Sequence, residues 1–486
     1  MRRAIAMLRS RSGRWWAVRA MAIALLAALL SRERVVVLSC IVIGICLFPI
    51  IRAAVLRKDL LAPITVFSAL YGTSFGVVPL LQRVGWIVLD PAYLRYAPEF
   101  ATRASWMSIG AILLVYLAYY EGRISSALAG MLPVIRSGVH LRSMRLMIMV
   151  LLVASAAAFA VLSRQFEAQY LAEYFIYYNV SAAGRGHIAF FALLYIPAGF
   201  LALMGIAASQ RQRQVFFIAV FLFSLILAIL SRSRGQLILL AFVALIFWNY
   251  QTHRLGVRRL VGVAMLMLMF IFFMAQFRGA REYHLGKENV ARSFSGMFTE
   301  HQATAALLSV YASETAPPHS YGKILIEDAI VALLPRKLWA AKPELYGSVL
   351  VTDLMVPNRQ KGFYYTTGPF GAALVDFGYT GIVIAMLAIG FLMRIVYEGF
   401  RRNARHPGVI LWYGLFCFYL WAFLRGGFGF LPVILEKTML VLVLNLFVVD
   451  RLRMLSGGGD VSDRALVSIP TSLIAGLRFL FYGRKL

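Results

Sequence analysis

The sequence predicts an all-α fold, a polytopic transmembrane bundle of about 12 helices with a large, partly helical periplasmic loop. Hydrophobic residues make up 61% of the 486 residues and charged residues only 14%, whereas a soluble domain carries about 25% charged residues. The mean hydropathy is +0.76, and the apolar runs are about as long as a bilayer is thick. These runs are apolar on every side, which excludes a transmembrane β-barrel, because barrel strands alternate apolar and polar residues.

Apolar runs mark the predicted spans to within a few residues at each end. In chain order they are 15–30, 35–51, 60–81, 106–120, 146–163, 187–208, 215–231, 236–250, 260–277, 371–396, 409–424 and 431–450. The first run is short and carries Arg19, so a position in the membrane interface is the alternative to a span. The chain is therefore expected to comprise a basic tail, nine spans, a large loop, three spans and a second basic tail, at 1–14, 15–277, 278–370, 371–450 and 451–486.

The excess of positive charge indicates both the orientation and the class of ligand. Forty-nine Lys and Arg residues against 21 Asp and Glu residues leave a net charge of +28. No soluble basic domain and no nucleic-acid motif accompanies this charge. We therefore expect the protein to bind anionic membrane lipid or an anionic lipid-linked ligand, and not nucleic acid. With the amino terminus inside, short inner segments carry 26 Lys and Arg residues and short outer loops carry 10. The positive-inside rule therefore predicts that both termini are cytoplasmic.

Residues 278–370 form the largest predicted loop, on the outer face of the membrane. A loop of this length in a compact protein is usually functional. Two stretches within it, 297–313 and 323–334, have apolar residues at helical spacing. We expect these helices to lie on the membrane surface or to dip into it.

Two arginines, Arg232 and Arg234, interrupt a long apolar stretch in the sequence SRSRGQ. One continuous helix over 215–250 would place both near the bilayer centre, which is energetically unfavourable. A tight outer hairpin with Gly235 at the turn avoids that cost. Two interpretations stay open: the arginines snorkel to the interface, or their planar guanidinium groups bind a phosphate.

Two further basic clusters belong to the large loop. The first, FRGAREYHLGK, places Arg278 and Arg281 on one face if the preceding helix continues. The second, LLPRKLWAAKP, contains Arg336 and Lys342 beside a tryptophan and two prolines. A solvated basic rim explains each cluster alone. Three outer clusters around one loop favour an anionic substrate at the membrane–water interface.

Acidic residues are too sparse to predict a metal site. No DxD, HExxH or CxxC motif is present, and transferases that hold Mg²⁺ or Mn²⁺ on a diphosphate usually need two carboxylates. We therefore expect arginine to balance any diphosphate, with no metal and no cofactor. Proton acceptors in the large loop are His284, Glu300, His301 and His319, for which a plain surface role is the alternative. The adjacent pair Glu300–His301 is the best candidate.

An aromatic, glycine-rich stretch, FYYTTGPFGAALVDFG, follows the loop and opens the next span. Tyr365 belongs to this stretch. Aromatic rings at an outer rim stack on sugar rings, although belts of Tyr and Trp are also routine at membrane interfaces. Asp376 lies at the entry of the helix, where we expect its carboxylate to orient a sugar hydroxyl or to pair with an arginine.

Four features together resemble one family: the SRSRGQ hairpin, the large loop after a helix ending in FRG, the LLPRKLWAAKP stretch and the DFGYTGIV helix entry. It is the family of Wzy-type O-antigen and exopolysaccharide repeat-unit polymerases of bacteria. The pattern covers residues 215–395, and helix count and loop placement extend it across the chain. Asp376 departs from the family, whose members often show Asn before the FG pair. The related O-antigen ligases share the architecture and the SRG-type hairpin.

The resemblance implies a glycosyltransferase of the GT-C type at the periplasmic face of the bacterial inner membrane. It would move a growing glycan from polyprenyl (undecaprenyl) diphosphate onto a new lipid-linked repeat unit. The implied partners are these polyprenyl-diphosphate-linked oligosaccharides, membrane lipids, and chain-length regulator and export proteins. An O-antigen ligase is the main alternative, followed by a lipid-linked oligosaccharide flippase and a non-enzymatic scaffold of an export complex.

In this interpretation, arginines stabilise the charge that develops on the diphosphate, and either His301 or Glu300 takes the proton of the acceptor hydroxyl. The catalytic candidates are Arg234, Arg278, His301 and Glu300. The substrate-binding candidates are Arg232, Arg281, Arg336, Lys342, Asp376 and Tyr365.

Overall fold

The computed structural model describes most of the transmembrane chain and part of the large loop. The described residues are 33–56, 59–87, 98–130, 141–166, 191–209, 211–230, 234–251, 298–324, 368–404 and 406–426, with short pieces at 255–269 and 353–354. Every regular element in these ranges is helical, which confirms the predicted all-α class. The elements are α3 (Arg34–Val55), α4 (Pro63–Gly72), the π-helix η1 (Thr73–Val77), α5 (Val78–Arg83), α6 (Pro98–Glu121), α7 (Arg123–Gly130), α8 (Leu141–Phe166), α11 (Tyr195–Ala208), α12 (Arg211–Leu230), α13 (Arg234–Gln251), α16 (Glu300–Tyr311), α19 (Gly371–Arg402) and α20 (Pro407–Gly426).

Among the described residues, six stretches are long and apolar enough to cross a membrane. They are Arg34–Val55, Pro63–Arg83, Glu99–Glu121, Leu141–Val161, Gly371–Arg402 and Pro407–Arg425. The helices α11, α12 and α13 are apolar but shorter. The predicted polytopic bundle is thereby confirmed. The predicted spans 15–30 and 431–450, and most of 260–277, lie outside the described residues, so the total of about 12 stays a prediction.

The chain divides into two compact units. The first comprises Met1–Tyr120, Gly256–Phe391 and Cys417–Glu436. The second comprises Glu121–Leu255, Leu392–Phe416 and Lys437–Leu486.

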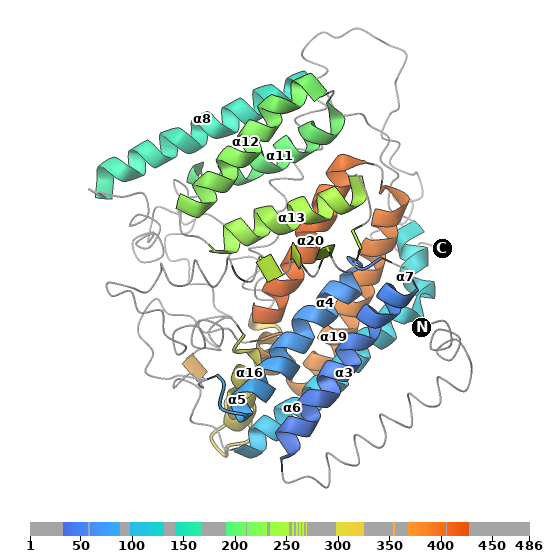
Figure 1. Ribbon diagram of the computed structural model, residues 1–486. Coiled ribbons are helices and arrows are strands. Elements are labelled where there is room, and N and C mark those ends of the chain that lie inside the picture. The colour runs from blue at the N-terminus through green and yellow to red at the C-terminus, as the bar shows by residue number, and fades with distance from the viewer. Residues whose placement is uncertain are drawn as a thin grey trace, which may run out of the picture. The chain divides into compact units, whose positions relative to one another are not determined.

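In the first unit, α3, the stretch α4–η1–α5 and α6 lie side by side (Figure 1). At one end, Arg83 Nε lies 2.8 Å from Glu33 Oε2, which joins the end of α5 to the start of α3. At the other end, the Arg52 guanidinium lies over the Tyr120 ring, 5.3 Å from its centroid. Therefore α3 and α6 run parallel, and α4–η1–α5 runs antiparallel to both.

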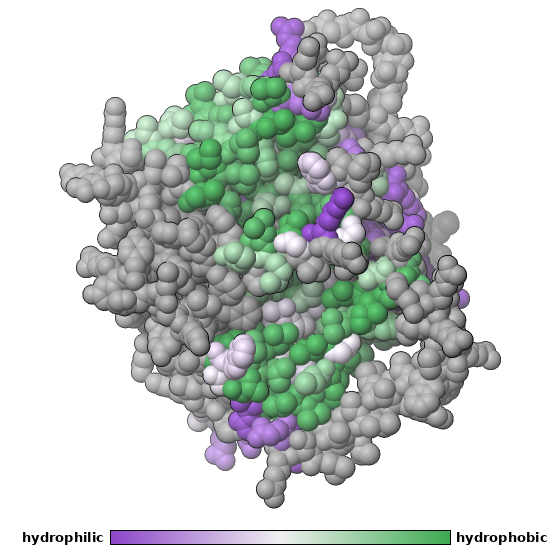
Figure 2. Space-filling model, viewed as in Figure 1, coloured by the Kyte–Doolittle hydropathy of each residue, from purple (hydrophilic) through white to green (hydrophobic). Residues whose placement is uncertain are grey.

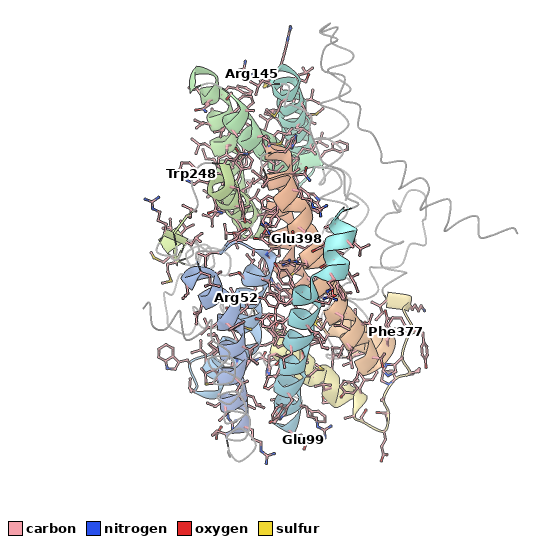
Figure 3. All side chains as sticks on the ribbon, turned by 90° about the vertical axis from the view of Figure 1, so that its right-hand side faces the viewer. Arg52, Glu99, Arg145, Trp248, Phe377 and Glu398 are labelled. Carbon is pink, nitrogen blue, oxygen red and sulfur yellow. The ribbon has the colours of Figure 1, made fainter. Side chains whose placement is uncertain are left out.

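The end of the first unit that carries Glu33 and the start of α6 is here called the loop end. Figure 3 shows Glu99, in the first turn of α6, at the opposite end of this unit from Arg52. The start of α6 contacts α16 there through Ser105 and His301. The segment before α19 contacts the last turn of α20 through a hydrogen bond between backbone groups. All of these segments belong to loops that the charge distribution placed on the outer side.

Aromatic rings fill the interior of the first unit. Tyr71 and Phe75 stack with ring centroids 4.6 Å apart, and Phe75 meets Phe370 at 5.3 Å. Small residues let the helices approach each other closely, as is usual between membrane helices. At Gly390 of α19, for example, a Cβ would lie 2.5 Å from the Val115 carbonyl oxygen of α6.

In the second unit, α11 packs against α8, α12 and α13. Ser155 of α8 donates a hydrogen bond of 2.7 Å to the Ala192 carbonyl oxygen, just before α11. Ser224 of α12 donates one of 3.0 Å to the Tyr195 carbonyl oxygen. The Tyr195 hydroxyl donates to Gln236, so the starts of α11 and α13 lie together.

Large apolar side chains are exposed on α3, α6, α8 and α12, as expected of faces that meet lipid. In Figure 2 the visible described surface over α3, α8 and α12 is largely apolar. This distribution agrees with helices that cross a membrane.

Two details differ from the sequence-based expectation. The helix predicted to begin at 106 begins at Pro98, because proline is favoured at the first helical position and the first turns are too polar to count as an apolar run. Gly235 does not form the turn of the predicted hairpin, since it is the second residue of α13. The helices α12 and α13 are separate elements that end at Leu230 and begin at Arg234, and residues 231–233 between them lie outside the described residues.

Candidate functional site

Three predicted site residues have described side chains, and all three belong to the first unit. Glu300 and His301 begin α16, and Asp376 lies in α19. Arg234 is described only as the first residue of α13, in the second unit. The other six lie outside the described residues, and their roles stay predictions; they are Arg232, Arg278, Arg281, Arg336, Lys342 and Tyr365.

The helix α16 confirms the helical pattern expected at 297–313. Its residues Glu300–Leu308 are all buried, so other parts of the protein surround it, and the expectation that it lies on the membrane surface or dips into it stays a prediction. Alanines at 303, 305 and 306 let it pack closely, and it contacts η1. The helix therefore carries its polar first turn into the protein interior. The second stretch expected to be helical, 323–334, lies outside the described residues beyond 324.

Glu300 is a carboxylic acid with no exposed surface. Burial raises its pKa to about 7, because the charged form loses hydration, and the positive charge of Arg425 opposes this shift. The Ser74 hydroxyl also lies beside the carboxylate and lowers its pKa. Neither carboxylate oxygen, however, is in hydrogen-bonding geometry with a described residue. Glu300 can therefore exchange a proton near neutral pH, as a general base must.

Arg425 lies in the last turn of α20, at the loop end. Its carbonyl oxygen accepts a hydrogen bond of 2.9 Å from the Gly368 amide, and its guanidinium lies over the Trp421 ring, 5.4 Å from the centroid. Its Nε atom is buried and has no partner among the described residues. Arg425 acts on Glu300 through its charge.

His301 joins α16 to α6. Its Nε2 lies 3.0 Å from Ser105 Oγ, and the Ser105 hydroxyl donates to the Ala101 carbonyl oxygen at 3.0 Å. Because that bond uses the one hydroxyl hydrogen, Nε2 carries the proton and donates to Ser105. Burial lowers the pKa of His301 to about 4, and the Ala101 carbonyl opposes this shift. His301 is therefore neutral at physiological pH and is the weaker base of the two neighbours.

The π-helical turn η1 faces α16 from within the span Pro63–Arg83. Such turns insert an extra residue into a helix and are frequent at functional sites. Here the turn brings Ser74 beside Glu300. It also places the Phe75 ring edge-on to the His301 ring, with centroids 6.4 Å apart. The turn thus contributes to both residues of the predicted pair.

Asp376 of α19 forms hydrogen bonds with the segment 319–324. Its Oδ1 accepts hydrogen bonds from the Ser320 hydroxyl and, at 3.1 Å, from the Ile324 amide. Its carbonyl oxygen accepts another, at 2.9 Å, from the Tyr321 amide. These contacts have a structural role, and a contact between Asp376 and a sugar stays a prediction.

The helix α19 is interrupted at Gly378, two residues after Asp376. Gly378 has φ +65°, a left-handed value that favours glycine. A Cβ at Gly378 would lie 3.1 Å from His319 Nε2. The His319 ring in turn stacks on Tyr311, at the end of α16, with centroids 5.1 Å apart. The break, the segment and α16 are thus packed together within the first unit.

The described part of the site combines one base with one positive charge. Within the described ranges, no group of three or more His, Cys, Asp or Glu side chains is placed to hold a metal ion. The chemistry available from these side chains is transfer of a proton to Glu300 and electrostatic stabilisation by Arg425.

Arg425 was not among the residues predicted from the sequence. Its signal in the sequence is the stretch FLRGGFGF, in which an arginine ends an apolar run before several glycines. Ser74 and Ser105 carry no such signal, because serine is routine in membrane helices.

Comparison with known proteins gives one family. A family model described as "Putative O-antigen polymerase" matches residues 187–435, slightly more than half of the 486 residues. The match includes α11 to α20 and the whole large loop, and so it contains Glu300, His301 and Arg425. No curated protein and no solved structure matches the chain.

Proposed function

The chain belongs to the O-antigen polymerase family, and on that premise we propose that it extends a bacterial surface polysaccharide, an O-antigen or an exopolysaccharide. Its substrates are oligosaccharide repeat units carried on polyprenyl diphosphate. The reaction takes place at the periplasmic face of the inner membrane. The family match and the multi-pass helical architecture support the proposal.

In the proposed step, a hydroxyl of the incoming repeat unit attacks the anomeric carbon of the growing glycan. A new carbon–oxygen glycosidic bond forms, and the bond between the anomeric carbon and the diphosphate oxygen breaks. The electron pair of the broken bond leaves with the diphosphate. The proton of the acceptor hydroxyl goes to a base and then to solvent, so the site needs a base that titrates near neutral pH.

The observation that carries this proposal is the buried Glu300 carboxyl, whose pKa is raised to about 7. A base with that pKa is deprotonated in half of the molecules at neutral pH and still takes a proton readily. The neighbouring His301 has a pKa lowered to about 4 and is fastened to α6. We therefore assign the base to Glu300 and a positioning role to His301.

The leaving diphosphate needs positive charge, which we assign to arginines and not to a metal. Arg234 and Arg278 are the proposed residues, because a guanidinium binds two phosphate oxygens at once. Turnover should then survive an excess of EDTA. A loss of activity on chelation, restored by Mg²⁺ or Mn²⁺, would contradict this assignment.

The experiment that tests the function uses the purified full chain in lipid nanodiscs. The substrate is lipid-linked oligosaccharide extracted from host membranes in which the gene has been inactivated, labelled with a fluorophore. A ladder of products that differ by one repeat unit is the expected result. Transfer only to a different acceptor would indicate a ligase, and movement of the labelled lipid across the bilayer without new bonds would indicate a flippase.

A further inference from the structure

Glu300 and Arg425 carry opposite charges and both contact Gly368, whose amide donates a hydrogen bond of 2.9 Å to the Arg425 carbonyl oxygen and where a Cβ would lie 3.5 Å from Glu300 Cβ. The charge of Arg425 also acts on the Glu300 carboxylate. Both carboxylate oxygens of Glu300 and the Nε atom of Arg425 lack a hydrogen-bond partner among the described residues. Buried polar atoms are nearly always hydrogen-bonded in folded proteins. A buried carboxylate and a buried guanidinium Nε without hydrogen-bond partners point to a ligand group that forms hydrogen bonds with both.

The chemistry of the pair selects the kind of group. It must accept a hydrogen bond from the Arg425 N–H and donate one to the Glu300 carboxylate. While Glu300 is ionised, which is the form that acts as a base, a phosphate or a carboxylate cannot do so, since it has no proton to donate and is repelled by the negative charge. A hydroxyl both accepts and donates. Arg425 is also partly exposed while Glu300 is not, so the hydroxyl reaches the pair from the Arg425 side.

We propose that Glu300 and Arg425 together bind the acceptor hydroxyl of the incoming repeat unit, with Arg425 as the second catalytic residue. This inference rests on the proposed function and adds the group that holds the acceptor oxygen. Arg425 donates to that oxygen, and Glu300 takes its proton as the oxygen bonds to the anomeric carbon. The positive charge then stabilises the oxygen while it loses its proton. The Trp421 ring and the Gly368 amide fix Arg425 for this role.

The charges around Glu300 make the pair testable through pH. Among the described residues, Arg425 on α20 is the charged group that acts on Glu300. Ser74 on η1 is a neutral hydroxyl, His301 on α16 is neutral, and Gly368 before α19 has no side chain. Removing the positive charge of Arg425 therefore raises the pKa of Glu300 further.

The test compares Arg425→Gln and Arg425→Lys with the wild type in nanodiscs. A fluorescent short polymer on its lipid serves as donor, and the unlabelled single lipid-linked repeat unit is the varied acceptor. We expect Arg425→Gln to raise the acceptor KM about 10- to 100-fold, because a hydrogen bond to a charged group is lost. We also expect the acid limb of its pH–rate profile to move to higher pH. Arg425→Lys should restore the position of the acid limb, because the positive charge returns. It should not restore the acceptor KM, because lysine lacks the planar guanidinium group that donates the hydrogen bond.

The matched control is Arg103→Gln. Arg103 is an exposed arginine on α6 that lies over the Phe100 ring, 5.1 Å from the centroid, and it has no role in the pair. Its acceptor KM and pH profile should equal those of the wild type.

An unchanged acceptor KM and an unchanged acid limb in Arg425→Gln, at equal protein level, would overturn the inference. A rise confined to the donor KM would also overturn it and assign Arg425 to the diphosphate. If Arg425→Gln does not accumulate, Arg425→Lys decides by its acceptor KM. A normal Arg425→Gln beside an inactive Glu300→Gln removes only this inference, whereas a wild type that forms no ladder removes the proposed function itself.

Discussion

The Glu300 carboxyl and the His301 imidazole are neighbours on α16 but meet different surroundings. The Glu300 carboxylate faces the positive charge of Arg425, and its two oxygens have no hydrogen-bond partner among the described residues. His301 faces Ser105 and the aromatic ring of Phe75. Two residues that were equal candidates in the sequence thereby become a base and a positioning residue. The difference arises from contacts made by α6, η1 and α20, which are distant in the chain.

The raised pKa of Glu300 predicts how stability depends on pH. The ordinary pKa of this carboxyl is 4.5 and its pKa in the folded protein is about 7, so the folded protein binds one more proton than the unfolded chain between these values. Stability should therefore fall as the pH rises from about 4.5 to about 7, by roughly 3 kcal/mol. Glu300→Gln should lack this fall. Thermal unfolding of both proteins in detergent at pH 5 and pH 8 measures it, and an equal fall in the variant would contradict the buried acid.

Arg234 is the arginine for which we predict the largest effect on the leaving diphosphate. Arg234→Ala should lower chain extension by roughly 10²–10³, because a contact that tightens in the transition state is lost. Arg234→Lys should recover only part, since charge returns without the planar fork. If the arginine only snorkels, the Lys variant should equal the wild type. Polymer length and protein level in membranes measure the effect, and full activity in Arg234→Ala at normal level would remove the residue from the site.

At the scale of elements, the loop end depends on small residues where helices cross and on one irregular turn. The π-helical turn η1 presents Ser74 and Phe75 to α16. The segment 319–324, which is hydrogen-bonded to Asp376, packs between α16 and α19. The helix α16 contacts η1 and α6. A change in the packing of these helices should therefore displace Glu300 even when the change lies far from it.

Two glycines in membrane helices give a matched pair for this packing. At Gly390 a Cβ would lie 2.5 Å from the Val115 carbonyl oxygen, whereas at Gly110 it would meet nothing within 4 Å. Gly390→Ala should lower the free energy of unfolding by about 1–3 kcal/mol, because α6 and α19 must separate. Gly110→Ala should leave it unchanged or raise it by about 1 kcal/mol. Unfolding temperatures in detergent compare the two, and equal values would contradict the close approach of α6 and α19.

At the scale of the whole molecule, the described parts of the predicted outer segments of the first unit lie together at one end. We propose that this loop end faces the periplasm. A reporter that is active only outside the cytoplasm should then be active when fused at Tyr346. It should be silent at Gly256 or Gly399. Activity at Gly399 would reverse the orientation and every assignment that depends on it.

The sequence predicted the fold class, most of the described spans, the break between α12 and α13, the helix α16 and the family. Hydropathy and charge are local properties of the sequence, so they are sufficient to predict the helices, and the family followed from the resemblance of four short sequence features. It did not predict Arg425, Ser74 or Ser105 beside the Glu300–His301 pair, because tertiary packing alone brings α20, η1 and α6 together there. The π-helical turn was missed for the same reason, since nothing in TSFGV distinguishes it from an α-helix.

The pH dependence of chain extension in Glu300 variants tests the central claim most directly. The measurement is the initial rate of ladder formation from pH 5 to pH 9 for the wild type, Glu300→Gln and Glu300→Asp. In the wild type, the rate should rise to a plateau with an apparent pKa near 7. In Glu300→Gln it should fall about 10²-fold or more and lose this rise, and Glu300→Asp should keep the rise at a lower rate. A Glu300→Gln variant with the wild-type rate and the wild-type pH profile would show that Glu300 is not the base.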